Sequence, residues 1–228
     1  MTSSSSERPI RSFVIRSGRT TDSQRKALSE HWDDHVIPFE AKPLDLSGAL
    51  PASDQLTVEI GFGMGDSLLE MAQQDPAMNF LGIEVHRPGV GKLLHGIAEH
   101  DVKNLKIMCH DATEVLAECF PEQSIDRILV FFPDPWPKKR HHKRRIIQKP
   151  FLSLLASRLK PGGQLHLATD WEQYAEHMME VLEQESALTN VFGPGSFYPD
   201  PARPATKFEN RGRRLGHGVW DLLFARKS

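Results

Sequence analysis

Asp134 lies in the stretch "FFPDPWPKKRHHKRR", residues 131 to 145, among three prolines and just before a dense run of positive charge. A carboxylate fixed beside a substrate can accept hydrogen bonds and stabilise positive charge that develops in a reaction. Proline fixes φ and pushes its predecessor toward extended geometry, which applies here to Phe132, Asp134 and Trp136. We therefore expect a stiff loop that mounts Asp134 as a reactive group, with Trp136 offering a flat face for a stacked base. The alternative is a rigid turn with a core Trp136 and a solvated Asp134.

The positive charge is local. Residues 138–145 hold six of the 28 Lys and Arg and no acid, although the whole chain has a formal net charge of −2. Without those six residues, the chain has 22 basic residues and 30 acidic ones. Such a patch is typical of a site for a polyanion, with a solvated face as the alternative. The candidate phosphate contacts are Lys139, Arg140, Lys143 and Arg144.

Strand-like and helix-like segments alternate along the chain. The segments expected to be strands are 55–63, 79–85, 105–112, 125–132, 164–170 and 219–227. The helices expected between them are 66–76, 87–101, 113–120, 146–163 and 171–186. This alternation predicts βαβ units and an α/β fold with a doubly wound, mostly parallel sheet.

Five acids stand at or near the ends of successive predicted strands: Glu59, Glu84, Asp111, Asp134 and Asp170. In open α/β sheets, ligands bind beyond the carboxyl ends of the strands. Glu84 lies where a ribose-binding acid sits in nucleotide-binding folds, and Asp111 is placed to meet an adenine edge. Each of these two acids, taken alone, is equally consistent with a helix cap or a surface acid.

A glycine loop, "EIGFGMG", follows the first predicted strand and contains Gly61, Gly63 and Gly65. Asp66 occupies the place of the third glycine of a dinucleotide fingerprint, and it suits the N-cap of the following helix. An acid there argues against a bound pyrophosphate, so the loop favours a nucleoside without phosphates. This form resembles the S-adenosylmethionine loop of class I methyltransferases.

Composition predicts one ordinary domain with a tail. The chain has 228 residues and is 39% hydrophobic, which is enough for a core. Residues 1–30 are expected to form a flexible N-terminal arm, and residues 31–228 the folded domain. The sequence shows no secretory signal, no membrane span, no disulfide framework and no metal-ligand spacing, so we expect a cytoplasmic protein without a metal ion. A monomer is expected, with a homodimer left open.

Several motifs together resemble the tRNA (guanine-N7-)-methyltransferase family over about residues 50–228. They are "VEIGFGMG", "GIEVHR", "CHDA", "FPDPWPKKRHHKRR", "LATDW" and "TKFE". The resemblance implies methyl transfer from S-adenosylmethionine to N7 of a guanosine in the tRNA variable loop. It implies cofactor contacts at Glu59, Glu84 and Asp111, and it marks Asp134 as the active-site acid. It also implies substrate contacts at Lys138, Asp170, Thr206, Lys207, Phe208 and Glu209.

Guanine N7 carries a lone pair in the neutral base, so its methylation needs alignment rather than a general base. Asp134 is therefore expected to orient guanine and stabilise its developing charge. Three alternatives stay open at this point. An exocyclic-amine methyltransferase would carry a proline pair where this chain has "PDPW". A nicotinamide oxidoreductase lacks support from the glycine loop, and a non-catalytic RNA-binding protein would not need the strand-end acids.

Overall fold

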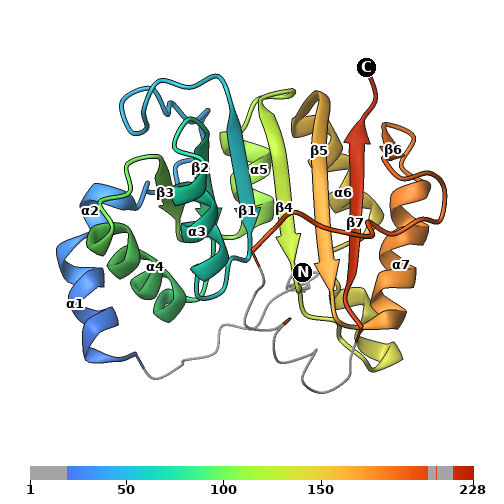
Figure 1. Cartoon of the computed structure of the whole chain (residues 1–228), viewed down its shortest axis with the longest axis horizontal. Helices are drawn as coiled ribbons and strands as arrows, with labels where there is room; N and C mark the ends of the chain where they lie inside the picture. The colour runs from blue at the N-terminus through green and yellow to red at the C-terminus, as the bar shows by residue number, and fades with distance from the viewer. Residues whose placement is uncertain (1–19, 205–208, 210–217) are drawn as a thin grey trace, which may run out of the picture.

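The protein is built on one seven-stranded sheet with the strand order β3-β2-β1-β4-β5-β7-β6 (Figure 1). This computed structural model describes residues 20–204, 209 and 218–228. The strands are β1 (Leu56–Ile60), β2 (Asn79–Ile83), β3 (Leu105–Met108), β4 (Ile125–Phe131), β5 (Leu159–Thr169), β6 (Leu188–Asn190) and β7 (Trp220–Arg226). Strands β1 to β5 are parallel, and β7 pairs antiparallel with both β5 and β6. The predicted doubly wound, mostly parallel sheet is confirmed.

Helices cover both faces of the sheet (Figure 1). They are α1 (Asp22–Glu30), α2 (Trp32–His35), α3 (Asp66–Gln74), α4 (Arg87–Glu99), α5 (Ala112–Cys119), α6 (Lys149–Arg158) and α7 (Glu172–Glu183). Residues of α1, α3 and α4 belong to one buried cluster, and residues of α5, α6 and α7 to the other. This double cover explains the nearly continuous apolar run of β4, because a parallel strand is buried on both sides.

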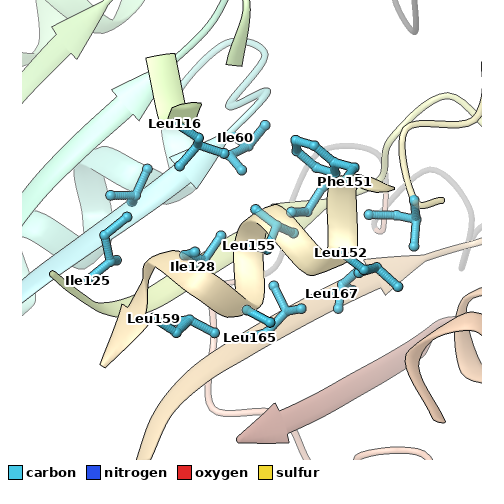
Figure 2. Packing of buried hydrophobic residues seen from close by; sticks show 14 of the residues in the cluster. Ile60, Leu116, Ile125, Ile128, Phe151, Leu152, Leu155, Leu159, Leu165 and Leu167 are labelled. Carbon is cyan, nitrogen blue, oxygen red and sulfur yellow. The ribbon is translucent and has the colours of Figure 1, made fainter. Parts of the chain in front are cut away.

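Helix α6 shows how the sheet is covered. Leu152 and Leu155 of α6 lie against Ile128 of β4 and against Leu165 and Leu167 of β5 (Figure 2). All five side chains are fully buried. Burial of each such side chain contributes about 1.5–3 kcal/mol to stability. This packing therefore fixes the positions of β4 and β5 relative to α6. The loop after β4 carries Asp134, so this packing also positions the predicted reactive residue.

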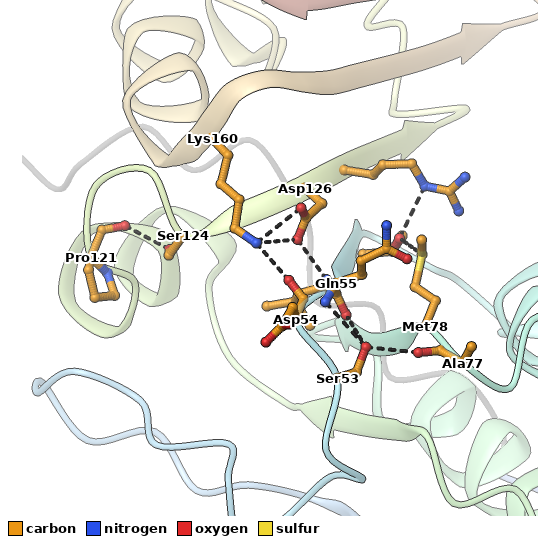
Figure 3. Close-up of polar contacts among 12 residues, drawn as sticks. Ser53, Asp54, Gln55, Ala77, Met78, Pro121, Ser124, Asp126 and Lys160 are labelled. Atoms are coloured by element: carbon orange, nitrogen blue, oxygen red, sulfur yellow. Dashed lines mark hydrogen bonds and ion pairs between the residues drawn. The ribbon is translucent and has the colours of Figure 1, made fainter.

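The amino ends of the central strands are joined by a polar network (Figure 3). The Lys160 ammonium lies 2.8 Å from a carboxylate oxygen of Asp126, and that oxygen accepts a hydrogen bond of 2.9 Å from the Leu56 amide. Lys160 also donates to the Asp54 carbonyl at 2.7 Å. Asp126 is therefore a structural acid that ties β1, β4 and β5 together at the sheet edge opposite the predicted site.

The N-terminal boundary and several elements differ from the sequence prediction. Part of the predicted arm is helix α1, whose capping box joins Thr21 and Gln24 and whose Ala27 is buried against α4. Order therefore begins before residue 31, while residues 1–19 lie outside the described residues. The helix expected over 146–163 spans only Lys149–Arg158, because Leu159 already starts β5. Strand β6 and the 3₁₀ helix η1 (Lys139–Arg144) were not predicted.

The segment from β6 toward β7 crosses the sheet on the side away from α6 and passes in front of β7 and β5 (Figure 1). Its Tyr198 amide donates to the Asp221 carbonyl of β7 at 2.8 Å. This crossing brings Arg203 to the carboxyl end of β4. None of the helices in the described part of the chain has the length and apolar character to cross a membrane.

Candidate active site

Two cavities lie at the carboxyl ends of the parallel strands, where the strand order turns from β1 to β4. The larger cavity has a volume of about 250 Å³ and is lined by Glu84, Asp111 and Asp134, which come from three different strand ends. The smaller cavity, about 160 Å³, is lined by Glu59 and the glycine loop. Gly61, Gly63, Phe131 and Phe132 line both cavities, so the two cavities are adjacent.

The smaller cavity contains two buried polar atoms that lack hydrogen-bond partners among the described residues. They are Oε2 of Glu59 and Oγ of Ser67. Burial, together with the nearby charge of Glu84, raises the pKa of Glu59 to about 8, although Arg203 acts in the opposite direction. An unsatisfied buried carboxyl is costly unless a ligand supplies the missing partner. These atoms therefore suit a ligand with a cationic or hydrogen-bond-donating end.

The glycine loop approaches the cavity closely because its backbone adopts left-handed conformations. Gly65 has φ +75°, and a β-carbon at this position would also meet the Leu93 side chain at 2.8 Å. Gly65 is the N-cap of α3, so the prediction of Asp66 as the N-cap is wrong. Asp66 is the first residue of the helix and forms an ion pair with Lys92. An acid in the first turn is favourable there because it faces the positive end of the helix dipole.

Glu84 and Asp111 line the larger cavity and also organise its walls. The Glu84 carboxylate accepts hydrogen bonds from the amides of Gly63 (2.8 Å), Val85 (2.7 Å) and His86 (3.0 Å). Glu84 therefore pins the glycine loop to the end of β2. Asp111 is the N-cap of α5 and accepts a bond of 2.8 Å from the Thr113 amide. A carboxylate has about four acceptor sites, so both acids retain capacity for a ligand.

The loop that carries Asp134 is held against local backbone preferences. Phe132 has φ 52° and Trp136 has φ 44°, although each precedes a proline. The prediction of extended geometry is therefore wrong for these two residues. Left-handed backbone at an aromatic residue costs on the order of 1–3 kcal/mol and persists only where surrounding contacts impose it. The Phe132 amide donates to the Ala168 carbonyl of β5 at 2.8 Å, which is one such contact.

Asp134 itself is exposed and lines the larger cavity. Its carboxylate makes no hydrogen bond or ion pair with any described residue, so the acceptor atoms are available to a ligand rather than used by the scaffold. Trp136, beside it, is stacked by the Arg144 guanidinium at 5.1 Å, and the His141 ring lies edge-on to it at 5.9 Å. A stacked base at Trp136 remains a prediction.

A second charged cluster lies beneath the site and was not predicted. Arg203 donates to both carboxylate oxygens of Asp221, at 2.6 and 2.7 Å, and to Glu209 at 2.5 Å. Its guanidinium also lies 5.2 Å from the ring centre of Phe131 and 5.4 Å from that of Phe132. Burial by itself would raise the pKa of Asp221, but hydrogen bonds from Arg203 and His166 outweigh it and lower that pKa. Only tertiary packing reveals this cluster, because Arg203 and Asp221 are separated by 18 residues.

The basic run forms η1 between Asp134 and Ile146, two residues that line the larger cavity. Lys138, Lys139, Arg140 and Lys143 are exposed, and Arg144 is half-buried against Trp136. The last cation of the run, Arg145, is only 4% exposed. The six cations therefore do not form one uniform surface.

The remaining predicted substrate residues are less closely gathered. Asp170 follows β5 and is half-buried, but neither it nor Lys138 is among the described residues that line the two cavities. Glu209 is buried and paired with Arg203. The predictions for Thr206, Lys207 and Phe208 lie outside the described residues. Within the described part of the chain, no group of three or more His, Cys, Asp or Glu residues is arranged to hold a metal ion.

Comparison with known proteins places these features in context. A family described as "Putative methyltransferase" matches residues 53–222. The tRNA (guanine-N(7)-)-methyltransferase of Cronobacter sakazakii is 53% identical over 220 residues, which cover 96% of this chain and 92% of the relative. The protein of the same name from Serratia proteamaculans is 51% identical over 221 residues, with the same coverage of both chains.

Solved structures agree with the fold. An rRNA methylase from Streptococcus thermophilus superimposes with a TM-score of 0.52 at 12% identity, over 77% of this chain and 89% of that one. A SAM-dependent methyltransferase from Aquifex aeolicus also gives a TM-score of 0.52 at 12% identity, over 90% of this chain and 89% of that one. At such low identity, these matches support the sheet architecture alone.

Proposed function

Because the chain belongs to the tRNA (guanine-N(7)-)-methyltransferase family, we propose that the site at the carboxyl ends of β1 to β4 binds S-adenosylmethionine and presents Asp134 to a tRNA guanine. The chain is an S-adenosylmethionine-dependent methyltransferase of tRNA and acts on guanine N7. The nicotinamide and exocyclic-amine alternatives are therefore set aside. What the family name leaves open is which residues perform each task.

The observation that carries the assignment is the convergence of four acids on two adjacent cavities. Glu59 reaches the smaller cavity, while Glu84, Asp111 and Asp134 reach the larger one. The unsatisfied Oε2 of Glu59 and Oγ of Ser67 fit a cofactor whose methionine end carries an ammonium group. Gly61 and Gly63 line both cavities, so a nucleoside and a methionine end can lie on either side of one loop.

The cofactor contacts follow from this geometry. We assign the methionine end to Glu59, with Gly61, Gly63 and Gly65 forming the close backbone surface. We assign the ribose to Glu84 and the adenine edge to Asp111, since both carboxylates retain acceptor capacity after their backbone hydrogen bonds are counted. When bound, S-adenosylmethionine supplies an electrophilic methyl group on a cationic sulfur.

Asp134 performs the orienting step in this proposal. Its exposed carboxylate accepts hydrogen bonds from the N1 and N2 edge of guanine, which distinguishes guanine from adenine. This contact aligns N7, and good alignment can remove roughly 7–11 kcal/mol from a bimolecular barrier. As N7 gains its methyl group, the base becomes cationic, and the fixed negative charge of Asp134 stabilises it. No proton has to leave N7, so no general base is required.

The substrate enters from the side of η1. Lys139, Arg140, Lys143 and Arg144 hold tRNA phosphates in this proposal, because η1 lies between two residues of the cavity wall. We further propose that the target guanosine lies in the variable loop and that Lys138, Asp170, Thr206, Lys207, Phe208 and Glu209 contact the substrate. A cytoplasmic location and a monomeric state, with a homodimer as the alternative, remain predictions.

A labelling experiment tests the assignment. The purified protein is incubated with tRNA from cells that lack 7-methylguanosine and with methyl-labelled S-adenosylmethionine, and the tRNA is then digested to nucleosides. We expect the label in 7-methylguanosine, and its loss when the variable-loop guanosine is replaced by adenosine. Label in another nucleoside would overturn the assigned reaction, and label that persists after the replacement would overturn only the assigned position.

A further inference from the structure

Arg145 differs from every other cation of the basic run because its side chain points into the protein. It is 4% exposed, whereas Lys139, Arg140 and Lys143 are exposed. Its Nε donates a hydrogen bond of 2.9 Å to the carbonyl oxygen of Pro135. Its Nη2 lies 3.3 Å from Nε2 of His142. Arg145 is thus not available to tRNA phosphates in the way its neighbours are.

The guanidinium rests on a rigid support. It lies 4.7 Å from the ring centre of Tyr174 in α7, and Tyr174 is fully buried in the core. The Tyr174 hydroxyl also accepts a hydrogen bond of 3.4 Å from the Ile147 amide, two residues after Arg145. A planar guanidinium can stack on an aromatic face and donate along its edge at the same time, which an ammonium group cannot do. Arg145 therefore connects the core to the Pro135 carbonyl.

The position of that carbonyl gives the contact its significance. Pro135 lies between Asp134 and Trp136, and Trp136 has the left-handed φ of 44° directly before Pro137. The residue before a proline is ordinarily extended, so the three prolines alone do not produce this loop shape. A strained backbone persists only where its surroundings over-determine it. The Arg145 hydrogen bond is one of the contacts that do so, at the residue directly after Asp134.

Burial of the Arg145 guanidinium is unfavourable unless other groups compensate its charge. Among the described residues no carboxylate forms an ion pair with it, and burial lowers the pKa of its guanidinium. Buried charges are ordinarily paired with opposite charges. Here, the compensation comes from a backbone carbonyl, a histidine nitrogen and an aromatic face, all of which fix orientation.

We propose that Arg145 is the positioning residue for Asp134. It holds the Pro135 peptide, and through it the strained 132–137 loop, so that the Asp134 carboxylate meets guanine at the correct place. This inference rests on the proposed function, because it takes Asp134 as the residue that contacts the substrate. It divides the basic run into cations that bind tRNA and one cation that shapes the active site.

The test compares Arg145→Met and Arg145→Lys with the wild-type protein. Single-turnover rates are measured at saturating tRNA and S-adenosylmethionine, and tRNA affinity is measured over a series of salt concentrations. A misplacement of about 1 Å can slow a reaction by about 10²-fold, so we expect a reduction of that order for Arg145→Met. The salt slope of tRNA binding and the cofactor dissociation constant should stay at their wild-type values. Arg145→Lys should recover only part of the rate because one ammonium cannot make all three contacts.

Two controls separate positioning from other roles. Lys143→Met removes an exposed neighbour in the same run, and its salt slope should fall by about 0.7–0.9, the value for one neutralised phosphate. Arg158→Met removes another arginine that donates to backbone carbonyls, those of Leu116 at 2.9 Å and Ala117 at 3.2 Å, at the opposite end of the sheet. It should lower the melting temperature without slowing the single-turnover rate.

The possible results are distinguishable. A wild-type rate for Arg145→Met, or a salt slope reduced as in Lys143→Met, would overturn the positioning role. If Arg145→Met does not fold, Arg145→Lys decides: an unimpaired rate overturns the proposal, and a reduced rate with an unchanged salt slope supports it. Asp134→Asn is measured in parallel. If that variant keeps the wild-type rate, the proposed function of Asp134 fails, whereas a slow Asp134→Asn beside a fast Arg145→Met refutes only the inference about Arg145.

Discussion

Glu59 should make the stability of the cofactor-free protein depend strongly on pH, and Glu59→Gln should remove the part of that dependence that comes from Glu59. Glu59 lies near the end of β1, is 3% exposed, and has an unsatisfied Oε2 among the described residues. Burial and the charge of Glu84 raise its pKa to about 8, and Arg203 offsets only part of this effect. Glutamine keeps the shape of the side chain and cannot ionise, so the variant isolates the titration of one group.

The size of the effect follows from linkage between protonation and folding. The pKa of Glu59 rises from an ordinary value of 4.5 to about 8 on folding. Each pKa unit is worth about 1.36 kcal/mol, so ionising Glu59 costs about 5 kcal/mol more in the folded state than in the unfolded state. The folded state binds more protons than the unfolded state between these two values. The stabilising contribution is therefore complete below about pH 4.5 and is lost as the pH rises through about 8.

Chemical denaturation of both proteins between about pH 6 and pH 9 measures this contribution. Over this range the wild-type free energy of unfolding should fall by about 3 kcal/mol more than that of Glu59→Gln. In a domain of this length, that corresponds to a difference of about 6–12 °C in melting temperature. Titration calorimetry at about pH 7 in buffers with different heats of ionisation adds a second readout. Cofactor binding should release a proton from the wild-type protein and none from the variant.

Asp126→Asn is the matched control. Asp126 is also a strand acid, but it is ion-paired with Lys160 at the opposite end of the sheet. Its removal should destabilise the protein and leave the slope over the same pH range parallel to that of the wild type. If the difference in unfolding free energy between Glu59→Gln and the wild-type protein were constant across this range, the pKa of Glu59 in the folded protein would lie outside it. The reasoning about its burial and its cofactor partner would then be refuted.

Three further predictions concern the other parts of the site. Glu84→Ala should weaken cofactor binding by roughly 1.5–3 kcal/mol, measured by calorimetry, because it removes charge-assisted acceptors and releases the Gly63 amide; an unchanged dissociation constant would exclude Glu84 from the cofactor site. Neutralising Lys139, Arg140, Lys143 and Arg144 together should weaken tRNA binding. The slope of the logarithm of affinity against the logarithm of salt concentration should become shallower by about 0.7–0.9 for each phosphate that these side chains neutralise in the wild-type complex. An unaltered slope would make η1 an ordinary solvated surface. Asp134→Asn should lower kcat by about 10²–10³-fold with little change in melting temperature, and it should discriminate less than the wild-type protein against a guanosine analogue without the N2 amine; equal discrimination in the two proteins would remove Asp134 from the base edge.

The loop that carries Asp134 differs in part from what its sequence predicts. The sequence predicts that the loop after β4 carries Asp134 at the carboxyl end of the strand, and in the structure Asp134 lines the larger cavity there. Local proline stiffness explains that loop only in part. Phe132 and Trp136 adopt left-handed backbone that their following prolines disfavour. Two hydrogen bonds join this loop to residues outside it, one from Arg145 to the Pro135 carbonyl and one from the Phe132 amide to the Ala168 carbonyl.

Much of the fold and the site could be predicted from the sequence because the relevant signals are local and periodic. Alternating strand-like and helix-like segments imply a parallel sheet, and the carboxyl ends of parallel strands necessarily meet at one edge. That logic placed Glu59, Glu84, Asp111 and Asp134 together, as the structure does. Asp126 is also a strand acid, but it lies at the amino end of its strand and is ion-paired with Lys160. Position within the strand therefore separates acids that line the cavities from acids that stabilise the sheet.

Only the tertiary structure decided what the charged residues do once the chain is folded. Arg144 and Arg145 are adjacent and chemically identical, yet one lies against Trp136 near the surface and the other is buried against Tyr174. Likewise, no local pattern pairs Arg203 with Asp221 or leaves Oε2 of Glu59 unsatisfied among the described residues. Burial and partner choice are set by contacts between segments distant in sequence. The sequence alone therefore determined which charged residues stand at the sheet edge, and long-range packing decided which of them line the cavities and which pair with other parts of the protein.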